Sequence, residues 1–291
     1  MPIVRLIADP ASLESVEQQP DWLMEAGVAL SLRQVKDDLF EFAYPIGSAE
    51  VLDRILDELL EARAALISAN GFEVPQVFVS DMDSTMIGQE CIDELADYAG
   101  IKDKIAEITE RAMQGELDFE QALRERVGLL AGLDESAIQQ CLAERITPMA
   151  GARTLVQTLN AKGCRTVLVT GGFHHFADPV GQMLGFERVV GNRLHVEEGR
   201  LTGGLLGHIV DSSVKEQVLE EESAKAGEHT ISLATGDGAN DIPMLEAATY
   251  GFAYHAKPKA RAAANGRIDE GDLTTVLTLL GIPESEWVID N

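Results

Sequence analysis

The stretch VFVSDMDSTMIGQE, from Val77 to Glu90, decides the fold of this chain. It opens with a short apolar run, typical of a buried strand, that leads directly into two carboxylates, Asp81 and Asp83. Two acids so close together repel each other, and burying either one without compensation is costly. We therefore expect either a positive charge beside them or a position at the exposed mouth of a cavity.

Two other apolar runs end on similarly polar segments. CRTVLVT ends at Thr170 and is followed by Gly171 and Gly172, and HTISLAT is followed by GDGAND, residues 236–241. The carboxyl ends of parallel strands meet at one edge of a sheet, where α/β proteins bind their ligands. The three segments together predict a functional site at that edge more strongly than any one of them alone.

Short apolar runs alternate with helix-like stretches from Gln76 onward, in QVFVS, CRTVLVT, HTISLAT and YGFAYHA. This alternation predicts an α/β fold with a doubly wound, Rossmann-like parallel sheet. Residues 88–148, approximately, lack strand signals and contain four helix-like segments, so we expect a helical cap inserted over the sheet edge. ERVVGNRLHVEEGRLTGGLLG alternates around a Glu-Gly turn, which predicts a β-hairpin.

Residues 1–75 are expected to form a separate small module, and residues 76–291 the catalytic domain. IVRLIA predicts a strand, ASLESVEQQPDWLMEAG a helix divided at Pro20, and VALSLRQVKDDLFEFAYPI two strands. AEVLDRILDELLEARAALI, residues 49–67, has apolar residues at helical spacing. The order strand–helix–strand–strand–helix indicates a ferredoxin-like α+β module, and NGFEVP reads as its linker.

The composition excludes some classes of partner. The net charge is −26, from 49 acidic against 23 basic residues, which repels nucleic acid and anionic membranes.

No apolar run reaches the roughly 18 residues that cross a bilayer, and MPIVRLIADP lacks the features of a signal peptide, so we expect a cytoplasmic protein. Cys91, Cys141 and Cys164 form no CxxC pair, which predicts free thiols. A homodimer is left open.

The aspartates at the strand ends predict a metal site. An Asp-x-Asp motif alone is also typical of a turn, and Asn240 or Asp241 can cap the following helix, but capping does not explain Asp237. Carboxylates on neighbouring strand ends favour a shared cation, and oxygen ligands suit Mg²⁺. No His/Cys cluster indicates zinc, since the adjacent His174 and His175 cannot easily share one metal.

Two features indicate a phosphate site. The backbone N–H groups around Gly171 and Gly172 would face an anion beside a helix start, although a Gly-Gly pair is often only a turn. Lys215 lies in the first turn of a predicted helix, where a cation opposes the helix dipole. A solvated lysine is the alternative interpretation, and a bound phosphate would explain the placement.

Together, DMDST, TGG, the isolated Lys215 and GDGAND resemble the haloacid dehalogenase superfamily, in order and spacing, across about residues 76–265. Within that superfamily, ECIDELADYAG, ERAMQGELDFEQALRERVGLL and AYHAKPK resemble the phosphoserine phosphatases. The resemblance implies Mg²⁺-dependent hydrolysis of O-phospho-L-serine, the last step of serine biosynthesis, through an aspartyl-phosphate. The motif that corresponds to TGG more often begins with serine in these enzymes, whereas here it begins with Thr170.

The resemblance implies residue roles. Asp81 would be the nucleophile and Asp83 the general acid and base, and the metal would be held by Asp81, the carbonyl of Asp83 and Asp237. The residues implied to bind phosphate or substrate are Glu90, Met113, Phe119, Arg126, Thr170, Gly171, Lys215 and Asn240. Glu90 would meet the ammonium group and Arg126 the carboxylate, for which a guanidinium fork is suited. For these two, an exposed helical pair is the alternative interpretation.

Other functions remain open at this point. The same core would serve phosphotransfer from phosphoserine to homoserine, or hydrolysis of another small phosphate ester. A non-enzymatic phospho-acceptor module also gathers aspartates around Mg²⁺, but it would lack the Asp83 acid and the helical cap. An amino-acid sensor acting through residues 1–75, whose element order resembles ACT modules, is a further alternative.

Overall fold

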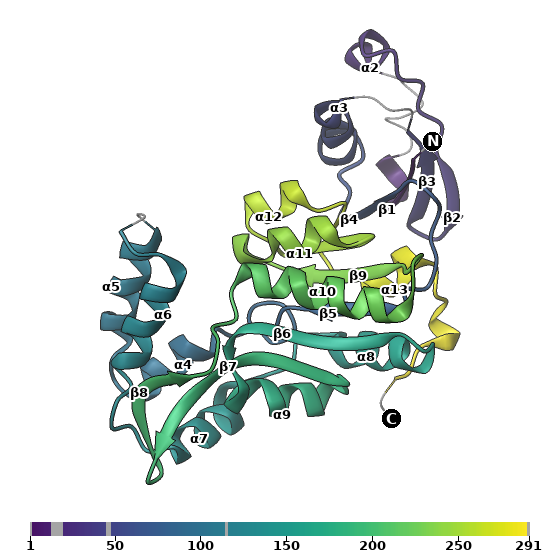
Figure 1. The fold of residues 1–291 in the computed structure, drawn as a ribbon. Coiled ribbons are helices and arrows are strands. Elements are labelled where there is room, and N and C mark those ends of the chain that lie inside the picture. The colour runs from purple at the N-terminus through teal and green to yellow at the C-terminus, as the bar shows by residue number, and fades with distance from the viewer. Residues whose placement is uncertain (1, 13–19, 45–47, 114–115, 290–291) are drawn as a thin grey trace.

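The computed structural model describes residues 2–12, 20–44, 48–113 and 116–289. Eleven strands form a mixed sheet that runs through the whole molecule (Figure 1). In sheet order the strands are β2 (Arg33–Lys36), β3 (Leu39–Ala43), β1 (Ile3–Ile7), β4 (Ala64–Ser68), β11 (Gly266–Ile268), β10 (Tyr250–Tyr254), β9 (Ser232–Gly236), β5 (Val77–Ser80), β6 (Arg165–Phe173), β7 (Arg188–Glu197) and β8 (Arg200–Leu206).

The centre of the sheet, from β11 to β7, is parallel, which confirms the predicted α/β core. Successive residues of its strands face opposite layers: Phe78 packs into one core cluster, and Val77 and Val79 into another. One layer contains α8 (Ala152–Ala161), α9 (His174–Leu184) and α13 (Thr274–Leu280). The other contains α10 (Ser212–Ala226), α11 (Ile242–Ala247) and α12 (Pro258–Ala263).

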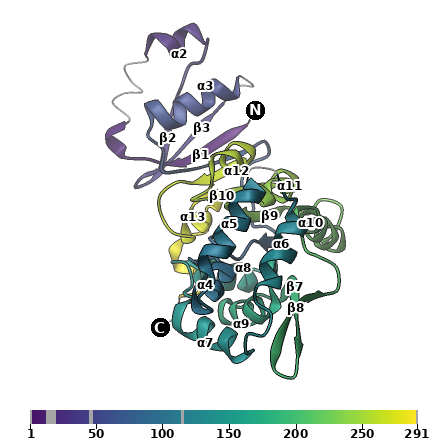
Figure 2. The same ribbon diagram turned by 90° about the vertical axis from the view of Figure 1, so that its left-hand side faces the viewer.

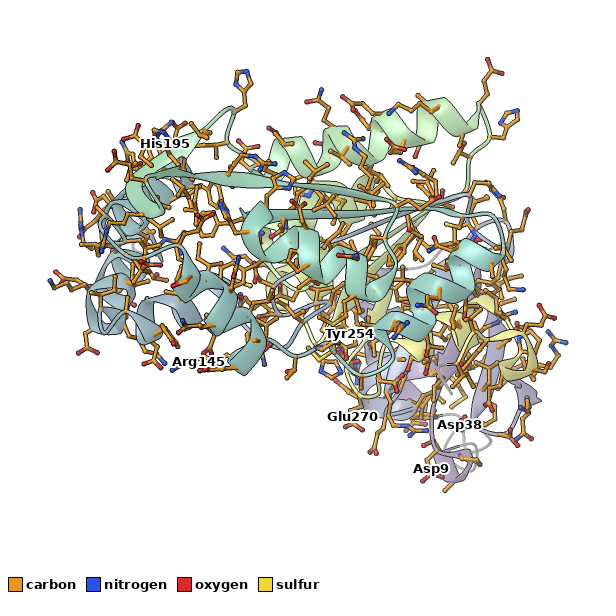
Figure 3. All side chains as sticks on the ribbon, turned by 90° about the horizontal axis from the view of Figure 1, so that it is seen from below. Asp9, Asp38, Arg145, His195, Tyr254 and Glu270 are labelled. Atoms are coloured by element: carbon orange, nitrogen blue, oxygen red, sulfur yellow. The ribbon has the colours of Figure 1, made fainter. Side chains whose placement is uncertain are left out.

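Among the described residues, four helices lie within residues 88–148, as predicted. They are α4 (Cys91–Tyr98), α5 (Lys102–Met113), α6 (Phe119–Gly128) and α7 (Ser136–Arg145). They gather on one side of the molecule, at the left in Figure 1 and facing the viewer in Figure 2, whereas β1–β3, α2 and α3 lie at the top of both views. Arg145 ties α7 to α4 through an ion pair with Glu94 at 3.1 Å (Figure 3). We call residues 88–148, which contain α4–α7, the insert.

The predicted hairpin is confirmed: β7 and β8 pair antiparallel around Glu198 and Gly199, which both have positive φ. The predicted helix over residues 49–67 is wrong in its second half. Helix α3 (Ala49–Arg54) continues into a π-helical turn, η2 (Ile55–Leu59), and Glu61 adopts a φ of 46°. The apolar run after it becomes β4, because it pairs with β1 and β11 inside the sheet.

The N-terminal elements also include η1 (Pro10–Ser12) and α2 (Asp21–Glu25), which begins directly after Pro20. The rest of the first predicted helix, residues 13–19, lies outside the described residues. The remaining short helices are η3 (Ala239–Asp241) and η4 (Glu284–Glu286). None of the helices in the described part of the chain is both long and apolar enough to span a bilayer.

Candidate active site

The carboxyl ends of β5, β6 and β9 meet beneath the insert and surround a pocket of about 460 Å³. The pocket contains predicted site residues from each of the three strand ends and from the insert. Its lining includes Asp81, Asp83, Glu90, Phe119, Arg126, Thr170, Gly171, Asp237 and Asn240. The structure therefore brings together nine of the side chains and loops that the sequence had singled out.

Lys215 lies beneath this pocket, between two carboxylates. Its Nζ donates to Oδ1 of Asp81 and to Oδ1 of Asp241, each at 2.6 Å. The lysine side chain is 1% exposed, so it is not a solvated surface residue. Helix α10 can carry it there because Asp211 caps the helix, accepting from the N–H groups of Ser213 and Val214.

The carboxylates outnumber this lysine. Asp81, Asp237 and Asp241 each offer an oxygen within 4.8 Å of the others, and all three are buried. Burial raises the pKa of Asp81 well above its usual value, and the charge of Asp241 adds to the rise while Lys215 opposes it. Burial also raises the pKa of Asp237. Three carboxylates against two ammonium groups, the buried Lys215 and the exposed Lys257 beside Asp237, leave a negative charge that fits a divalent cation, which prefers oxygen ligands.

The Asp83 carboxylate has different partners from Asp81. Its Oδ1 accepts from the backbone N–H of Cys91, at the start of α4, at 3.0 Å, and its Oδ2 accepts from the Thr170 hydroxyl at 3.3 Å. Burial raises the pKa of Asp83, which these hydrogen bonds only partly oppose. A carboxyl group with a raised pKa, lining the same pocket as Asp81, is suited to carrying a proton.

Residues 170–172 do not form the expected turn after the strand but an irregular segment within β6, where the pairing with β7 shifts register between Val169 and Phe173. This segment is held from two sides. The Thr170 hydroxyl accepts from the Gly172 N–H at 2.8 Å, and Asn192 on β7 donates to the Gly171 carbonyl at 2.8 Å. A Cβ on Gly172 would lie 2.9 Å from Oδ2 of Asp83, so glycine is required for this close approach. Sequence reasoning missed Asn192, which carries no local motif.

Glu90 and Arg126 come from the insert. Glu90 accepts from the Ser84 hydroxyl at 2.8 Å. It is open to water at the pocket mouth, yet the protein around its other sides and the charge of Asp83 raise its pKa to about 7. Burial lowers the pKa of Arg126, and the charges of Asp93 and Glu90 oppose that change. The pocket thus contains one acid and one base on the side facing the strand ends.

The other predicted residues are less enclosed. The Phe119 ring is 39% exposed and covers Gly171, where an added Cβ would lie 3.2 Å from the ring. Asn240 lines the pocket and is exposed. Met113 ends α5, but its side chain lies outside the described part of the chain. Lys257, which lines the pocket and forms an ion pair with Asp237, was not predicted.

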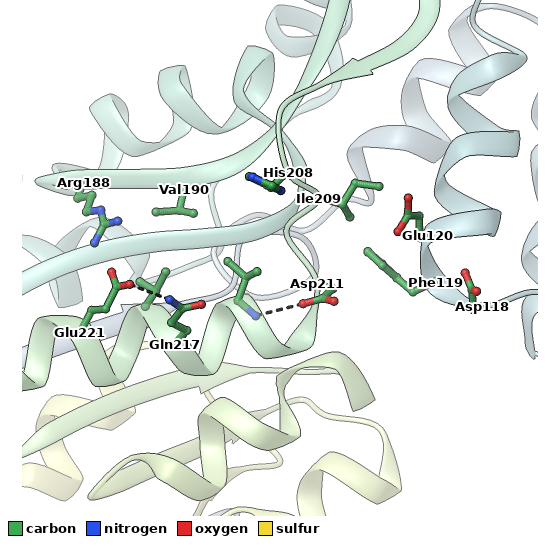
Figure 4. A pocket seen from close by; sticks show the side chains of 12 residues that line it. Asp118, Phe119, Glu120, Arg188, Val190, His208, Ile209, Asp211, Gln217 and Glu221 are labelled. Carbon is green, nitrogen blue, oxygen red and sulfur yellow. Dashed lines mark hydrogen bonds between the residues drawn. The ribbon is translucent and has the colours of Figure 1, made fainter.

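A larger hollow of about 750 Å³ lies on the other side of Phe119, between α6, β7 and α10 (Figure 4). It is lined by acidic, apolar and two basic side chains, Arg188 and His208, and by none of the strand-end aspartates 81, 83, 237 and 241. We therefore place the candidate active site in the smaller pocket.

Comparison with known proteins agrees with this geometry. The family of haloacid dehalogenase-like hydrolases matches residues 78–246, more than half of the chain. The chain belongs to this family. Hydrolases of this family generally use a divalent metal, which fits the buried carboxylate cluster.

Curated relatives of this haloacid dehalogenase-like hydrolase are phosphoserine phosphatases. That of Streptomyces coelicolor is 39% identical over 98% of this chain and 71% of its own length. That of Lactococcus lactis is 46% identical over 69% of this chain and 93% of its own length. Two others are longer, and the chain spans 65% and 60% of their length. A solved probable phosphoserine phosphatase from Vibrio cholerae is 30% identical, with a TM-score of 0.76 over 98% of this chain and 87% of its own.

Proposed function

We propose that this hydrolase is a phosphoserine phosphatase that hydrolyses O-phospho-L-serine to L-serine and phosphate with Mg²⁺. One observation carries the proposal: a single pocket is lined by Glu90 and Arg126 from the insert, by Asp81 directly after β5, and by residues 170–172 near the end of β6. The substrate has an ammonium group, a carboxylate and a phosphate, and these residues offer one complementary partner to each.

Asp81 is the proposed nucleophile. Its carboxylate oxygen would bond to phosphorus while the bond from phosphorus to the serine oxygen breaks, and Asp83 would give its proton to the leaving oxygen. Asp83 would then take a proton from the water that attacks the aspartyl-phosphate, releasing phosphate and restoring Asp81. The hydrogen bond from the Cys91 N–H holds the Asp83 carboxylate in place for both transfers.

The Thr170 hydroxyl, the Gly171 N–H, Lys215 and Asn240 are the proposed partners of the phosphoryl oxygens. Asp81, Asp237 and the backbone carbonyl of Asp83 are the proposed metal ligands. Bound Mg²⁺ would neutralise phosphoryl charge in the transition state. Phe119 and Met113 would shield the site from water.

We further propose that residues 88–148 act as a cap over a catalytic domain of residues 76–291, because the insert supplies Glu90 and Arg126 to the pocket. Residues 1–75 are proposed to be a ferredoxin-like, ACT-related module. The antiparallel order β2-β3-β1-β4, with helices after β1 and β3, supports this assignment. In the described residues, β4 joins the module to the core through β11.

Phosphate release from matched esters tests the function. With Mg²⁺, we expect kcat/KM to be higher for O-phospho-L-serine than for O-phosphoethanolamine, which lacks the carboxylate, and for phosphoglycolate, which lacks the ammonium group. Similar kcat/KM values for all three esters would contradict the assignment. Adding homoserine tests whether the phosphoryl group is transferred to an alcohol. If labelled phosphate appeared on homoserine, the reaction would be phosphotransfer and not hydrolysis.

A further inference from the structure

Lys257 is a cation of the pocket that the proposed mechanism does not use. It precedes Pro258, the first residue of α12, and its backbone N–H donates to the Asp237 carbonyl at 2.9 Å. Its own carbonyl accepts from the N–H of Arg261 at 3.0 Å. Arg261 is in turn held by Asp269 at 2.9 Å, so the backbone of Lys257 is fixed beside the metal-binding aspartate.

The side chain of Lys257 is far less constrained than its backbone. It is 71% exposed, and its Nζ lies 3.4 Å from Oδ2 of Asp237. Exposed ion pairs contribute little free energy, and the lysine stem has several rotatable bonds, so this contact is easily exchanged for another. Lys257 lines the same pocket as Asp81 and Thr170, so its side chain borders the cavity in which we place the phosphate.

The charges of the pocket require such an exchange. Among the described lining residues, Asp81, Asp83, Glu90 and Asp237 are acidic, whereas Arg126 and Lys257 are basic. A metal ion held by Asp237 would take over the charge compensation that Lys257 provides and would repel the nearby ammonium group. The incoming substrate brings a phosphate dianion to the same place and provides a new partner for that group.

We propose that Lys257 is a phosphate-binding residue that pairs with Asp237 until this carboxylate ligates the metal, and then donates to a phosphoryl oxygen. The proposal rests on the proposed function only in taking this pocket as the phosphate site. It predicts two opposite effects of removing the ammonium group. Metal affinity should rise because a competing cation is lost, and phosphate affinity should fall because a donor is lost.

Calorimetric titration of the full chain measures both effects. For Lys257→Met we expect the Kd for Mg²⁺ alone to fall about two- to fivefold, the size of an exposed charge interaction. The Kd for inorganic phosphate, titrated into the Mg²⁺-saturated protein, should rise about tenfold or more, the size of one charge-assisted hydrogen bond. Lys257→Arg should keep the phosphate Kd within about twofold of the wild-type value.

Lys259→Met is the matched control, because it removes an equal charge two residues away from a side chain that is exposed and does not line the pocket. It should change neither constant. An unchanged phosphate Kd in Lys257→Met overturns the proposal, as does an unchanged or higher Kd for Mg²⁺. Both constants are measured without turnover, so failure to hydrolyse phosphoserine would overturn the proposed substrate and leave this inference standing.

Discussion

Nζ of Lys215 lies 2.6 Å from Oδ1 of Asp81, and both side chains are almost completely buried. Burial alone would lower the pKa of this lysine, but attraction to Asp81 and Asp241 raises it, so the ammonium group stays charged. Strands β5 and β9 can thus be followed by the buried Asp81 and Asp241 because Lys215 of α10 supplies the compensating positive charge. The pair links the stability of the sheet edge to the chemistry that we assign to it.

Lys215→Met should destabilise the protein by about 3 kcal/mol, because it leaves buried carboxylates without their partner. Urea unfolding at pH 7 measures the free energy. Added Mg²⁺ should restore part of the loss, since it binds the same carboxylates in the folded state. Lys104→Met, at an exposed position of α5, is the control and should change stability little. Equal losses in the two variants would show that Lys215 is not a structural charge.

Asp81→Asn should abolish turnover and leave the fold intact. The amide keeps the shape of the carboxylate and reduces the repulsion within the cluster, but it is not a nucleophile. We expect kcat for phosphoserine to fall about 10⁴-fold or more. Circular dichroism checks the fold, and Asp103→Asn, exposed on α5, controls for the loss of one acid. Appreciable activity in purified Asp81→Asn would exclude this residue as the nucleophile.

Glu90 should give the reaction a pH dependence. Its pKa in the free protein is raised to about 7, so only above that pH is it mostly the carboxylate that attracts an ammonium group. We expect kcat/KM for phosphoserine to increase as the pH rises through about 7, apart from ionisation of the substrate phosphate near pH 6. Glu90→Gln should remove this increase, and phosphoglycolate should not show it. Persistence of the increase in Glu90→Gln would assign it to another group.

Arg126→Ala should lower kcat/KM to different extents for substrates with and without a carboxylate. Loss of a guanidinium–carboxylate pair should lower kcat/KM for phosphoserine about 10- to 100-fold, and that for phosphoethanolamine by much less. Arg124→Ala is the control in the same helix, since Arg124 pairs with Glu120 on the surface. Parallel losses for the two esters would mean that Arg126 does not recognise the carboxylate.

Sequence predicted the parts of this site that lie on strand ends, because Asp81, Thr170 and Asp237 each follow a recognisable apolar run. It could not predict contacts made across the sheet. Asn192 supports the Gly171 carbonyl from the neighbouring strand, and nothing in its local sequence indicates that role. β4 was mistaken for helix because AALIS is too short to show a period, and its pairing with β1 and β11 decides its conformation.

Ion pairs of Asp57 attach the N-terminal part of the chain to the core. Asp57, on η2, accepts from Arg261 of α12 at 2.8 Å and also pairs with the buried Arg267 of β11. Although burial raises the pKa of Asp57, these two arginines lower it below its usual value. An aspartate with a lowered pKa adds stability above its unfolded-state pKa, and that stability is lost as the pH falls through the folded-state value.

Asp57→Asn should therefore reduce the free energy of unfolding by about 1 kcal/mol at pH 7, a modest value because the carboxylate is partly exposed. The difference from wild type should begin to shrink as the pH falls below about 4, where Asp57 of the unfolded chain takes up a proton, and it should disappear below the lower pKa of Asp57 in the folded protein. Asp53→Asn is the matched control, because Asp53 is 66% exposed and reaches Arg267 only at 4.0 Å. Urea unfolding across this pH range measures all three proteins. If Asp53→Asn destabilised as much as Asp57→Asn, the attachment would depend on the general negative charge of this surface and not on the Asp57 ion pairs.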